Sequence, residues 1–537
     1  MRKILSLIFL IFFSAYVIKA GSNMATIPFH EFDEGHRAEN AKKMKEYFSF
    51  LVPLTGSPVD RTENLKIPLR ENPNLFLYYH PERPPFVYWL MIASTSIFGP
   101  FEWAYRLPSF LMTIATISVF LIFMYYSRSK VSYTAAAVGT LSLITSADLW
   151  LSGQYAQLDT SFTFFLFLSL LLLIKYCEKK KNIFIVISGL SFSLAVLSKG
   201  QPAIIYIFPL VLLYFMKKIT LRDILKFGAS TAIILLPWFL LLEIYFGFAK
   251  ILTIFTKFAA SSAIFEYSHI KAPIFWYIRW WWDSFRPGWT LFLAFLALDF
   301  YSAGFKLQNL SWKKLTLLGY IFGGLVLFSL SVNKIWWYVL PLVPAVSFYV
   351  YTSAYDYLKI NQAKLVNLSL SIVLISVPIF LTETNTVTLI YGILLTFLTF
   401  FILIKEIKLP KKISTSVFLT SLVFSLFVFF LNFPKIVPYH TDTKFVAEIY
   451  KGLPGKKCLY LLDIPPETAL FYSNAGEIIP LTEKKELFPD CDNFLITPSD
   501  ITKSKIIFYL KGKPYNLLNQ EIIFQKDNMK LIKLQGS

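Results

Sequence analysis

Long apolar runs recur along most of this chain of 537 residues, and short polar segments separate them. An α-helix needs about 20 mostly apolar residues to cross the hydrocarbon core of a bilayer. Only 16% of the residues are charged, compared with roughly 25% in a soluble domain. The sequence therefore predicts a polytopic α-helical membrane protein with about 13 transmembrane helices. The candidate spans are residues 4–20, 104–126, 131–147, 159–175, 183–197, 202–216, 226–246, 289–304, 315–331, 335–354, 364–380, 386–404 and 413–432.

Basic residues between the apolar runs indicate the topology. The net charge is +19, and lysines and arginines gather in segments that join one apolar run to the next. Such an excess is typical of cytoplasmic loops. We therefore expect a multi-pass protein of the inner (plasma) membrane with a cytoplasmic N-terminus. Binding of nucleic acid is the poorer explanation of the charge, because no basic stretch is both long and part of a soluble fold.

The start of the chain resembles a signal peptide. Arg2 and Lys3 precede an apolar stretch at residues 4–16. No small-residue cleavage site stands out after this stretch, so we interpret it as a retained first helix.

The spans divide the chain into a transmembrane domain, residues 1–432, and a polar tail, residues 433–537. With the N-terminus inside, a first outer loop at residues 21–103 and a second at residues 247–288 share the periplasmic side with the tail. Residues 86–99 are apolar but too few to span a bilayer, so a juxtamembrane helix is expected there.

The tail reads as a small extracytoplasmic α/β domain. Residues 458–462 and 494–496 have the pattern of strands, and residues 466–473 that of a helix. Cys458 and Cys491 could form a disulfide if this compartment is oxidising. Cys177 is expected to be a free thiol in a cytoplasmic loop.

Two adjacent acids follow the first span. Asp33 and Glu34 begin a segment whose apolar residues recur at helical spacing. Acidic residues at a helix start interact favourably with the helix dipole, which is the simpler explanation. One carboxylate would be enough for that, however, and the neighbouring His36 and Arg37 would remain unexplained. Because carboxylates can deprotonate an acceptor hydroxyl or orient the hydroxyls of a sugar, we predict that both acids are catalytic.

A second charged pair stands where the chain returns to the membrane. Glu82 and Arg83 precede two prolines, which fix the backbone and end any helix before them. The guanidinium of Arg83 is a rigid fork that suits phosphate, although an interfacial arginine can also simply extend toward water. Asp159 lies at the outer end of a span, where an acid is usually functional.

Two lysines break the charge pattern of the loops. Lys199 and Lys334 lie at outer turns, where few lysines are expected. They indicate an anionic partner. Carboxylates and cations beside aromatic surface suit a phosphorylated lipid that carries a sugar. The set on the outer face also includes His269, Lys271 and Tyr338.

These segments resemble, in the same order, the motifs of the lipid-linked-sugar glycosyltransferases of the GT-C superfamily. The resemblance is closest to the aminoarabinose transferases (ArnT) and the related protein O-mannosyltransferases, and it extends to about residue 350. Two departures are that Arg83 replaces a lysine and that residues 56–76 lengthen the first loop. The matching segments are Asp33-Glu34, Glu82-Arg83-Pro84-Pro85 with Tyr88-Trp89, Leu158-Asp159, Ser198-Lys199-Gly200, His269 to Tyr277, and Lys334 with Tyr338, Leu340 and Pro341.

The resemblance implies a GT-C fold and a single inverting displacement at the anomeric carbon of a polyprenyl-phosphate sugar. Asp33, Glu34 and Asp159 would act on the acceptor and the sugar, and cations would neutralise the departing phosphate. Glu82 and His269 match positions that hold a metal ion. Two protein ligands are an incomplete shell for zinc, so a divalent metal could bind but none is required. The residues expected to bind the donor phosphate are Arg83, Lys199, Lys271, Lys334 and Tyr338.

The expected acceptor is lipid A or another glycolipid of the outer face. The alternative within this class is transfer of a hexose to serine or threonine of a protein. The alternative from another class is a lipid or sugar transporter. A transporter would place ionisable residues at mid-bilayer on broken helices, whereas here they lie at the ends of spans and in outer loops.

Overall fold

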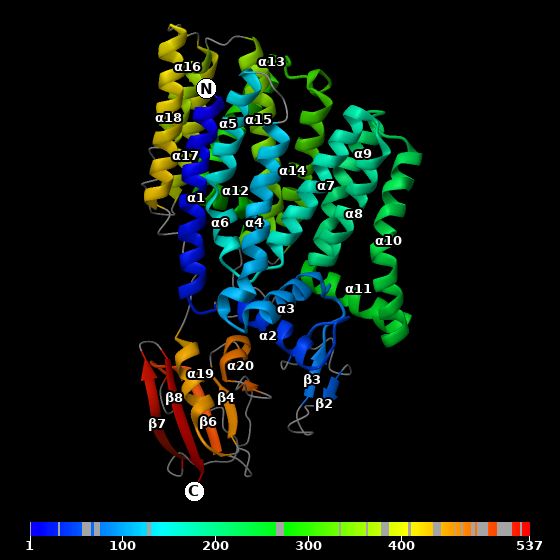
Figure 1. Cartoon of the computed structure of the whole chain (residues 1–537), viewed down its shortest axis with the longest axis vertical. Coiled ribbons are helices and arrows are strands. Elements are labelled where there is room, and N and C mark those ends of the chain that lie inside the picture. The colour runs from blue at the N-terminus through cyan, green and yellow to red at the C-terminus, as the bar shows by residue number, and fades with distance from the viewer. Residues whose placement is uncertain are drawn as a thin grey trace.

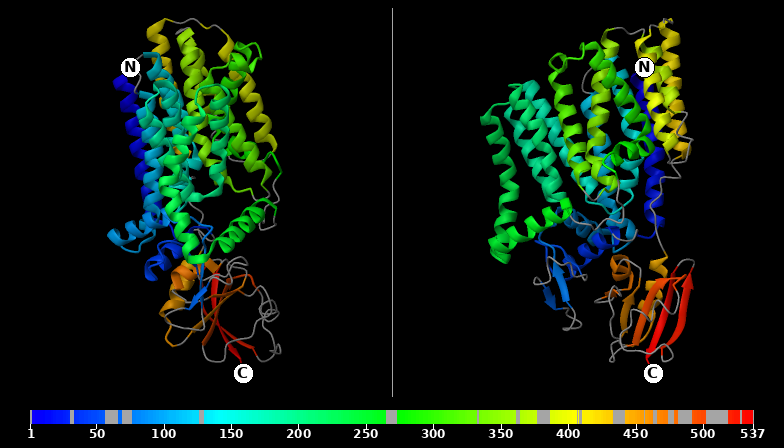
Figure 2. Two further views of the ribbon diagram at one scale, coloured as in Figure 1. Left: turned by 90° about the vertical axis from the view of Figure 1, so that its right-hand side faces the viewer. Right: turned by 180° about the vertical axis from the view of Figure 1, so that it is seen from behind.

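The computed structural model shows a bundle of long helices that stands on a layer of short helices and two small sheets (Figure 1). Helix α1 begins at the far end of the bundle, and the tail lies beyond the opposite end in every view (Figure 2). The structure describes residues 2–29, 33–55, 66–68, 76–125, 130–264, 273–331, 334–360, 364–376, 386–405, 407, 410–432, 442–455, 457–462, 466–473, 478–480, 492–501, 518–526 and 529–536.

Each predicted span coincides with a helix, which confirms the polytopic α-helical fold. In the described ranges, 7 helices are long and apolar enough to cross a membrane, or up to 8 if the bent pair of α5 and α6 (Ala147–Gly153) is one span. The number of crossings therefore stays a prediction. The helices at the predicted spans are α1 (Arg2–Thr26), α4 (Glu102–Tyr125), α5 (Lys130–Ile144), α7 (Asp159–Lys179), α8 (Asn182–Lys199), η1 (Gln201–Tyr206) with α9 (Ile207–Phe215), α10 (Leu221–Phe246), α13 (Arg286–Ser302), α14 (Trp312–Leu330), η3 (Trp336–Leu342) with α15 (Val343–Ile360), α16 (Leu365–Ser376), α17 (Thr386–Ile404) and α18 (Lys411–Asn432), and a short turn, η2 (Leu307–Asn309), joins α13 to α14.

Small residues let neighbouring helices of the bundle approach closely, as in many membrane helix pairs. The Ser169 hydroxyl of α7 donates to the Ser188 carbonyl of α8 at 2.9 Å. A Cβ on Gly189 would lie 2.6 Å from the Phe227 carbonyl oxygen of α10. These contacts hold α8 between α7 and α10, and they fix the helix that ends at Lys199.

Short elements of residues 33–98 and 248–284 cover one end of the bundle (Figure 1, Figure 2). The predicted helix after Asp33 is confirmed, and its apolar positions Ala38, Ala41 and Met44 are buried. The predicted juxtamembrane helix is α3. The elements are α2 (Asp33–Glu46), α3 (Phe86–Phe98), α11 (Phe248–Ile264) and α12 (Trp276–Ser284), with an antiparallel sheet of β1 (Leu54–Thr55), β3 (Phe76–Tyr79) and β2 (Lys66–Pro68).

The tail contains a five-stranded sheet in the order β5-β4-β6-β8-β7. β4 is parallel to β5 and β6, whereas β8 is antiparallel to β6 and β7. The predicted strands coincide with β4 and β6, and the predicted helix coincides with α20. The elements are α19 (Thr443–Gly452), β4 (Lys457–Leu461), α20 (Pro466–Ser473), β5 (Ile478–Pro480), β6 (Asp492–Pro498), β7 (Leu518–Lys526) and β8 (Met529–Gly536).

The cysteines differ in their state. Cys458 in β4 is disulfide-bonded, and its expected partner Cys491 lies outside the described residues. Cys177 is a free, buried thiol. It lies within α7, which continues to Lys179, and not in a loop as the sequence predicts.

Helix α2 contacts the tail directly through Gly35. A Cβ at this position would lie 2.5 Å from the Thr468 hydroxyl oxygen and 2.8 Å from the Thr468 Cα in α20. Backbone atoms cannot move away as a side chain can, so only glycine allows this approach. Tyr472 of α20 adds a hydrogen bond, because its hydroxyl accepts from the backbone N–H of Phe29 at 3.0 Å.

We expect Gly35→Ala to loosen the contact between the tail and α2, at a cost of about 1 to 3 kcal/mol for the overpacked site. The measurement is the rate at which a protease separates the tail from the full chain in detergent, which should rise several-fold. Gly228→Ala is the matched control, because its Cβ position has no neighbour within 4 Å in the described structure. Equal cleavage rates for the two variants would contradict the close contact at Gly35.

Candidate active site at the tail-facing end of the bundle

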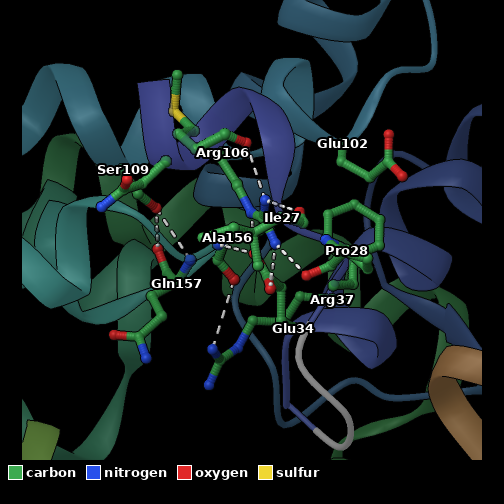
Figure 3. Close-up of polar contacts among 12 residues, drawn as sticks. Ile27, Pro28, Glu34, Arg37, Glu102, Arg106, Ser109, Ala156 and Gln157 are labelled. Atoms are coloured by element: carbon green, nitrogen blue, oxygen red, sulfur yellow. Dashed lines mark hydrogen bonds and ion pairs between the residues drawn. The ribbon is translucent and has the colours of Figure 1, made fainter. Parts of the chain in front are cut away.

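A buried ion pair ties the first turn of α2 to the helix bundle (Figure 3). Arg106 of α4 donates from Nε to Glu34 Oε1 at 2.6 Å and from Nη2 to Oε2 at 2.9 Å. Glu34 Oε1 also accepts from the backbone N–H of Ala156 at 2.8 Å. The two charged side chains are buried almost completely. The pair therefore joins three segments that are far apart in the sequence.

Arg106 also fixes the chain between α1 and α2. Its guanidinium donates to the carbonyls of Met24, Ile27 and Pro28 at 2.9, 2.5 and 2.9 Å. Both oxygens of Glu34, a predicted catalytic residue, are thus held by structural donors. These contacts fit a positioning role for Glu34 directly beside Asp33.

Asp33 and Arg37 lie one turn apart on α2. Arg37 Nη2 lies 3.3 Å from Asp33 Oδ2, and the two side chains are 6% and 34% exposed. Arg37 Nη1 donates to the Ala156 carbonyl at 3.5 Å (Figure 3). The buried Nε of Arg37 has no hydrogen-bond partner among the residues that the structure describes. Arg37 therefore has a donor left for a ligand.

Asp159 opens α7, three residues after the segment that Glu34 and Arg37 hold. Its Oδ1 forms an ion pair with Lys199 at the end of α8. Asp159 is fully buried, and its Oδ2 has no hydrogen-bond partner in the described part of the chain. A buried carboxylate oxygen without a donor is costly, so this atom indicates a place for a ligand hydroxyl.

Arg83 reaches the same region from the turn before α3. A Cβ on Gly200 would lie 3.4 Å from Pro84 Cγ, so this turn rests on the end of α8. Burial disfavours the charge of Arg83, but Tyr88 and the carboxylates nearby raise its pKa above the ordinary value. Arg83 is therefore a permanent cation.

Electrostatic contacts join these side chains into one set. Lys199 interacts electrostatically with Asp159, Arg37 and Asp33. Its Nζ lies 4.4 Å from the centre of the Tyr338 ring. Tyr338 interacts with the two carboxylates and the two arginines. The set contains three cations and two acids, and Glu82, which also acts on Arg83, is held by His80. This balance favours an anionic ligand. We call it the outer cluster, and it consists of Asp33, Arg37, Arg83, Asp159, Lys199 and Tyr338.

Glu82, a predicted metal ligand, lies beside two histidines. Its Oε1 lies 3.0 Å from His80 Nδ1, and the His36 and His80 rings meet edge-on with centres 6.0 Å apart. Burial acts to raise the pKa of Glu82, but His80 and then Arg83 bring it below its usual value. The described residues contain no group of three His, Cys, Asp or Glu that could hold a metal. The other predicted ligand, His269, lies outside them.

Lys271 and Lys334 are the two other lysines that are predicted to bind the donor phosphate. Lys334 is buried and donates to the Ser331 carbonyl at 2.9 Å. Its neighbour Ile335 accepts from the backbone N–H of Tyr338 at 3.0 Å, but no described contact joins the Lys334 side chain itself to the outer cluster. Lys271 lies outside the described residues. The roles of both lysines stay predictions.

Arg37 and Arg106 are absent from the predicted site, although each had a signal in the sequence. Arg37 follows Asp33 by four residues, a spacing that places two side chains on one helix face. Arg106 is an ionisable residue in an apolar span, where such residues are usually paired or functional. Neither signal names the partner, which in the case of Arg106 is Glu34.

The buried imidazole of His36 should make stability depend on pH. Burial, and then the charges of Arg83, His80 and Arg37, lower the pKa of His36 in the folded chain. In the unfolded chain, His36 takes up a proton below about pH 6.5, whereas in the folded chain it stays neutral to a lower pH. The free energy of unfolding should therefore fall as the pH drops below that value. We expect His36→Asn to reduce the difference between the thermal unfolding midpoints at pH 7.5 and 5.5. An unchanged difference would contradict this.

Part of the chain matches a known enzyme family. Residues 82–242 match the family model described as dolichyl-phosphate-mannose-protein mannosyltransferase. This segment includes Arg83, Asp159 and Lys199 of the outer cluster. An uncharacterized protein of Aquifex aeolicus (strain VF5) is 27% identical over 360 residues, which are 66% of this chain and 64% of that protein.

Solved structures resemble nearly the whole chain. The apo structure of ArnT from Cupriavidus metallidurans has a TM-score of 0.64 at 14% identity, over 98% of this chain and 97% of that chain. The same enzyme bound to undecaprenyl phosphate has a TM-score of 0.62 at 14% identity. The apo oligosaccharyltransferase of Archaeoglobus fulgidus has a TM-score of 0.53 at 10% identity, over 98% of this chain and 74% of that chain. The predicted fold is confirmed.

Proposed function

We propose that this chain, which has the ArnT-like fold of the GT-C superfamily of glycosyltransferases, transfers a sugar from a polyprenyl-phosphate carrier to an acceptor at the outer face of the membrane. The observation that carries the proposal is the outer cluster, in which cations and two carboxylates meet at one end of a membrane helix bundle. The related ArnT structure with undecaprenyl phosphate supports this carrier as the donor lipid.

The cations of the outer cluster would bind the donor phosphate. Negative charge grows on that phosphate as its bond to the sugar breaks, and cations already in place stabilise it without reorganisation. Arg83 can form two parallel hydrogen bonds to a phosphate, and Arg37 has an unpartnered Nε. Lys199 and Tyr338 would complete this side, and we retain Lys271 and Lys334 as further candidates.

The carboxylates would act on the acceptor and the sugar. The acceptor oxygen attacks the anomeric carbon, the bond from that carbon to the phosphate oxygen breaks, and the electron pair leaves with polyprenyl phosphate, so the configuration inverts. Asp33, the more exposed acid, would take the proton of a hydroxyl acceptor. A phosphate acceptor already has an ionised oxygen that can attack, so it needs no base, and Asp33 would then be a positioning group. Asp159 Oδ2 would accept a hydrogen bond from the sugar.

Lipid A or another glycolipid of the outer face is the acceptor that we propose first. The likeness to ArnT along nearly all of the chain supports it. Transfer to protein serine or threonine is the second candidate, which the mannosyltransferase family match supports. Transport has less support, because Asp159 begins α7 and Lys199 ends α8, so these charges lie at helix ends.

The proposed mechanism assigns no step to a divalent metal, and Glu82 and His269 stay its predicted ligands. Zinc takes three or four protein ligands, and in the described part of the chain only Glu82 of the predicted ligands is available, with Oε2 buried and without a hydrogen-bond partner. The described residues do not complete a metal shell, so no step is assigned to a metal.

The proposal is tested by expressing the chain in a Gram-negative host that lacks its own enzyme of this kind but makes polyprenyl-phosphate sugars. Mass spectrometry of lipid A should show an added sugar with the wild type and none with Asp33→Asn. A sugar on peptides in place of lipid A would select the second acceptor. A well-expressed wild type that modifies neither lipid A nor protein in such a host would contradict the proposed function.

A further inference from the structure

A cavity of about 670 Å³ lies between the tail and the outer layer of the membrane domain. Its walls come from the last turns of α2, the start of α4, and the tail helices α19 and α20. The volume is in the range of small-molecule sites. None of its lining residues belongs to the outer cluster, so the cavity is a separate site.

Part of the charge in the cavity wall is neutralised. Lys444 of α19 forms an ion pair with Glu102 of α4, which also accepts from the Tyr472 hydroxyl at 3.3 Å. Glu46 pairs with Lys43, outside the cavity, at 2.9 Å. These two lining carboxylates are therefore not available to repel an anion.

Unpaired lysines remain on both sides of the cavity. Lys45 of α2 and Lys451 of α19 are exposed, and neither has an ion-pair partner where the structure is described. Glu448 is a carboxylate of the same wall that has no ion-pair partner among the described residues. The cavity therefore has lysines from two elements and less negative than positive charge. Such an arrangement suits a phosphate group.

Aromatic rings form much of the remaining wall. Tyr105, Phe471 and Tyr472 line the cavity, and Lys42 Nζ lies 5.5 Å from the centre of the Phe471 ring. Apolar and aromatic walls with a few convergent polar groups are typical of ligand sites. The C–H faces of a sugar ring can pack on such rings while its hydroxyls bond to the charged groups.

Exposed apolar side chains adjoin one edge of the cavity. Phe48 lines the cavity and is 73% exposed. Pro100, also in its lining, stands in the turn between α3 and α4, where Phe98 and Phe101 are exposed. Large exposed apolar side chains next to a membrane-entering helix mark contact with lipid. The ligand can therefore keep its acyl chains in the bilayer.

We propose that this cavity binds the phosphorylated saccharide headgroup of a membrane lipid, which serves as the acceptor if the chain has the transferase function proposed above. Lys42 and Asp33 lie on the same helix, about 13 Å apart along its axis at 1.5 Å per residue. A headgroup with more than one sugar spans that distance, so α2 links the acceptor site to the outer cluster.

The experiment measures ligand binding to the purified full chain by native mass spectrometry. The probes are bisphosphorylated lipid A, phosphatidylglycerol, inorganic phosphate and undecaprenyl phosphate. The double variant Lys45→Glu/Lys451→Glu should bind lipid A at least about tenfold more weakly than the wild type. The matched control is Lys250→Glu/Lys306→Glu, which changes the charge equally at exposed lysines outside the cavity and should bind like the wild type.

The outcomes separate this proposal from the proposed function. Equal binding of lipid A by both double variants would overturn the cavity as its site, while retained binding of undecaprenyl phosphate would leave the transferase proposal intact. Phosphatidylglycerol or inorganic phosphate could also displace lipid A when present at the same concentration as lipid A. That result would overturn the claim that the cavity recognises the saccharide of the headgroup. A wild type that binds lipid A but not undecaprenyl phosphate would count against the proposed function alone.

Discussion

Replacing Glu34 with glutamine is expected to destabilise the chain by about 3 to 5 kcal/mol, the usual cost of breaking a buried ion pair. Arg106 would keep its charge in a site where both side chains are almost fully buried. An amide offers one oxygen where the carboxylate offers two, and its NH₂ group would face guanidinium donors. The change should appear as a large drop in the thermal unfolding midpoint of the full chain in detergent.

An exposed ion pair provides the control for this substitution. Asp492 lies 3.0 Å from Lys533 in the tail sheet, and its side chain is 47% exposed. Exposed pairs contribute about 0 to 1 kcal/mol, so Asp492→Asn should leave the midpoint nearly unchanged. If Glu34→Gln behaved like Asp492→Asn, the ion pair with Arg106 would not anchor α2.

The largest expected effect on activity is that of Asp33→Asn. Loss of a general base lowers turnover by about 10² to 10⁴-fold, and we expect a drop in this range with a hydroxyl acceptor. Binding of the donor lipid should change little, because Arg37, Arg83 and Lys199 remain. The measurement is the turnover number and the KM for donor, with the purified chain in lipid nanodiscs.

The pattern of the kinetic change is informative. A fall in kcat at constant KM supports a role for Asp33 in the chemical step. Turnover within a factor of about three of the wild type would contradict that role. Asp492→Asn serves as the control again, because it makes the same chemical change far from the outer cluster and should leave both constants unchanged.

The helix bundle was predictable because each span is a local pattern, an apolar run that ends in basic or polar residues. The span ends were less accurate. α7 continues past the predicted end at residue 175 to Lys179, since lysine side chains at a helix end can extend toward water while their stems stay in apolar surroundings. For this reason Cys177 lies in a helix.

Helix α11 was not predicted within the second outer loop. Gly247 has a φ of +82° and ends α10, and an apolar helix follows at once. The sequence does not show that a separate helix begins directly after a span, because the turn between the two helices is not visible in the apolar pattern. Here the turn depends on one glycine with a positive φ.

The outer cluster was predictable in part, because charged residues at the ends of apolar spans are informative one by one. Asp33, Arg83, Asp159, Lys199 and Tyr338 were predicted and do lie together. The buried ion pair of Glu34 was not predictable, because its partner Arg106 is 72 residues away in the sequence. The same holds for Gly35, whose need for a small residue comes from Thr468 in the tail.

The affinity of the purified chain for undecaprenyl phosphate tests the central claim, that the outer cluster holds a polyprenyl phosphate. The comparison is between the wild type, Arg83→Gln and the control Lys250→Gln on the exposed face of α11. The account predicts that Arg83→Gln weakens binding at least about tenfold, as expected for the loss of a charged pair of hydrogen bonds, and that Lys250→Gln binds like the wild type. Equal affinity of all three proteins would contradict it.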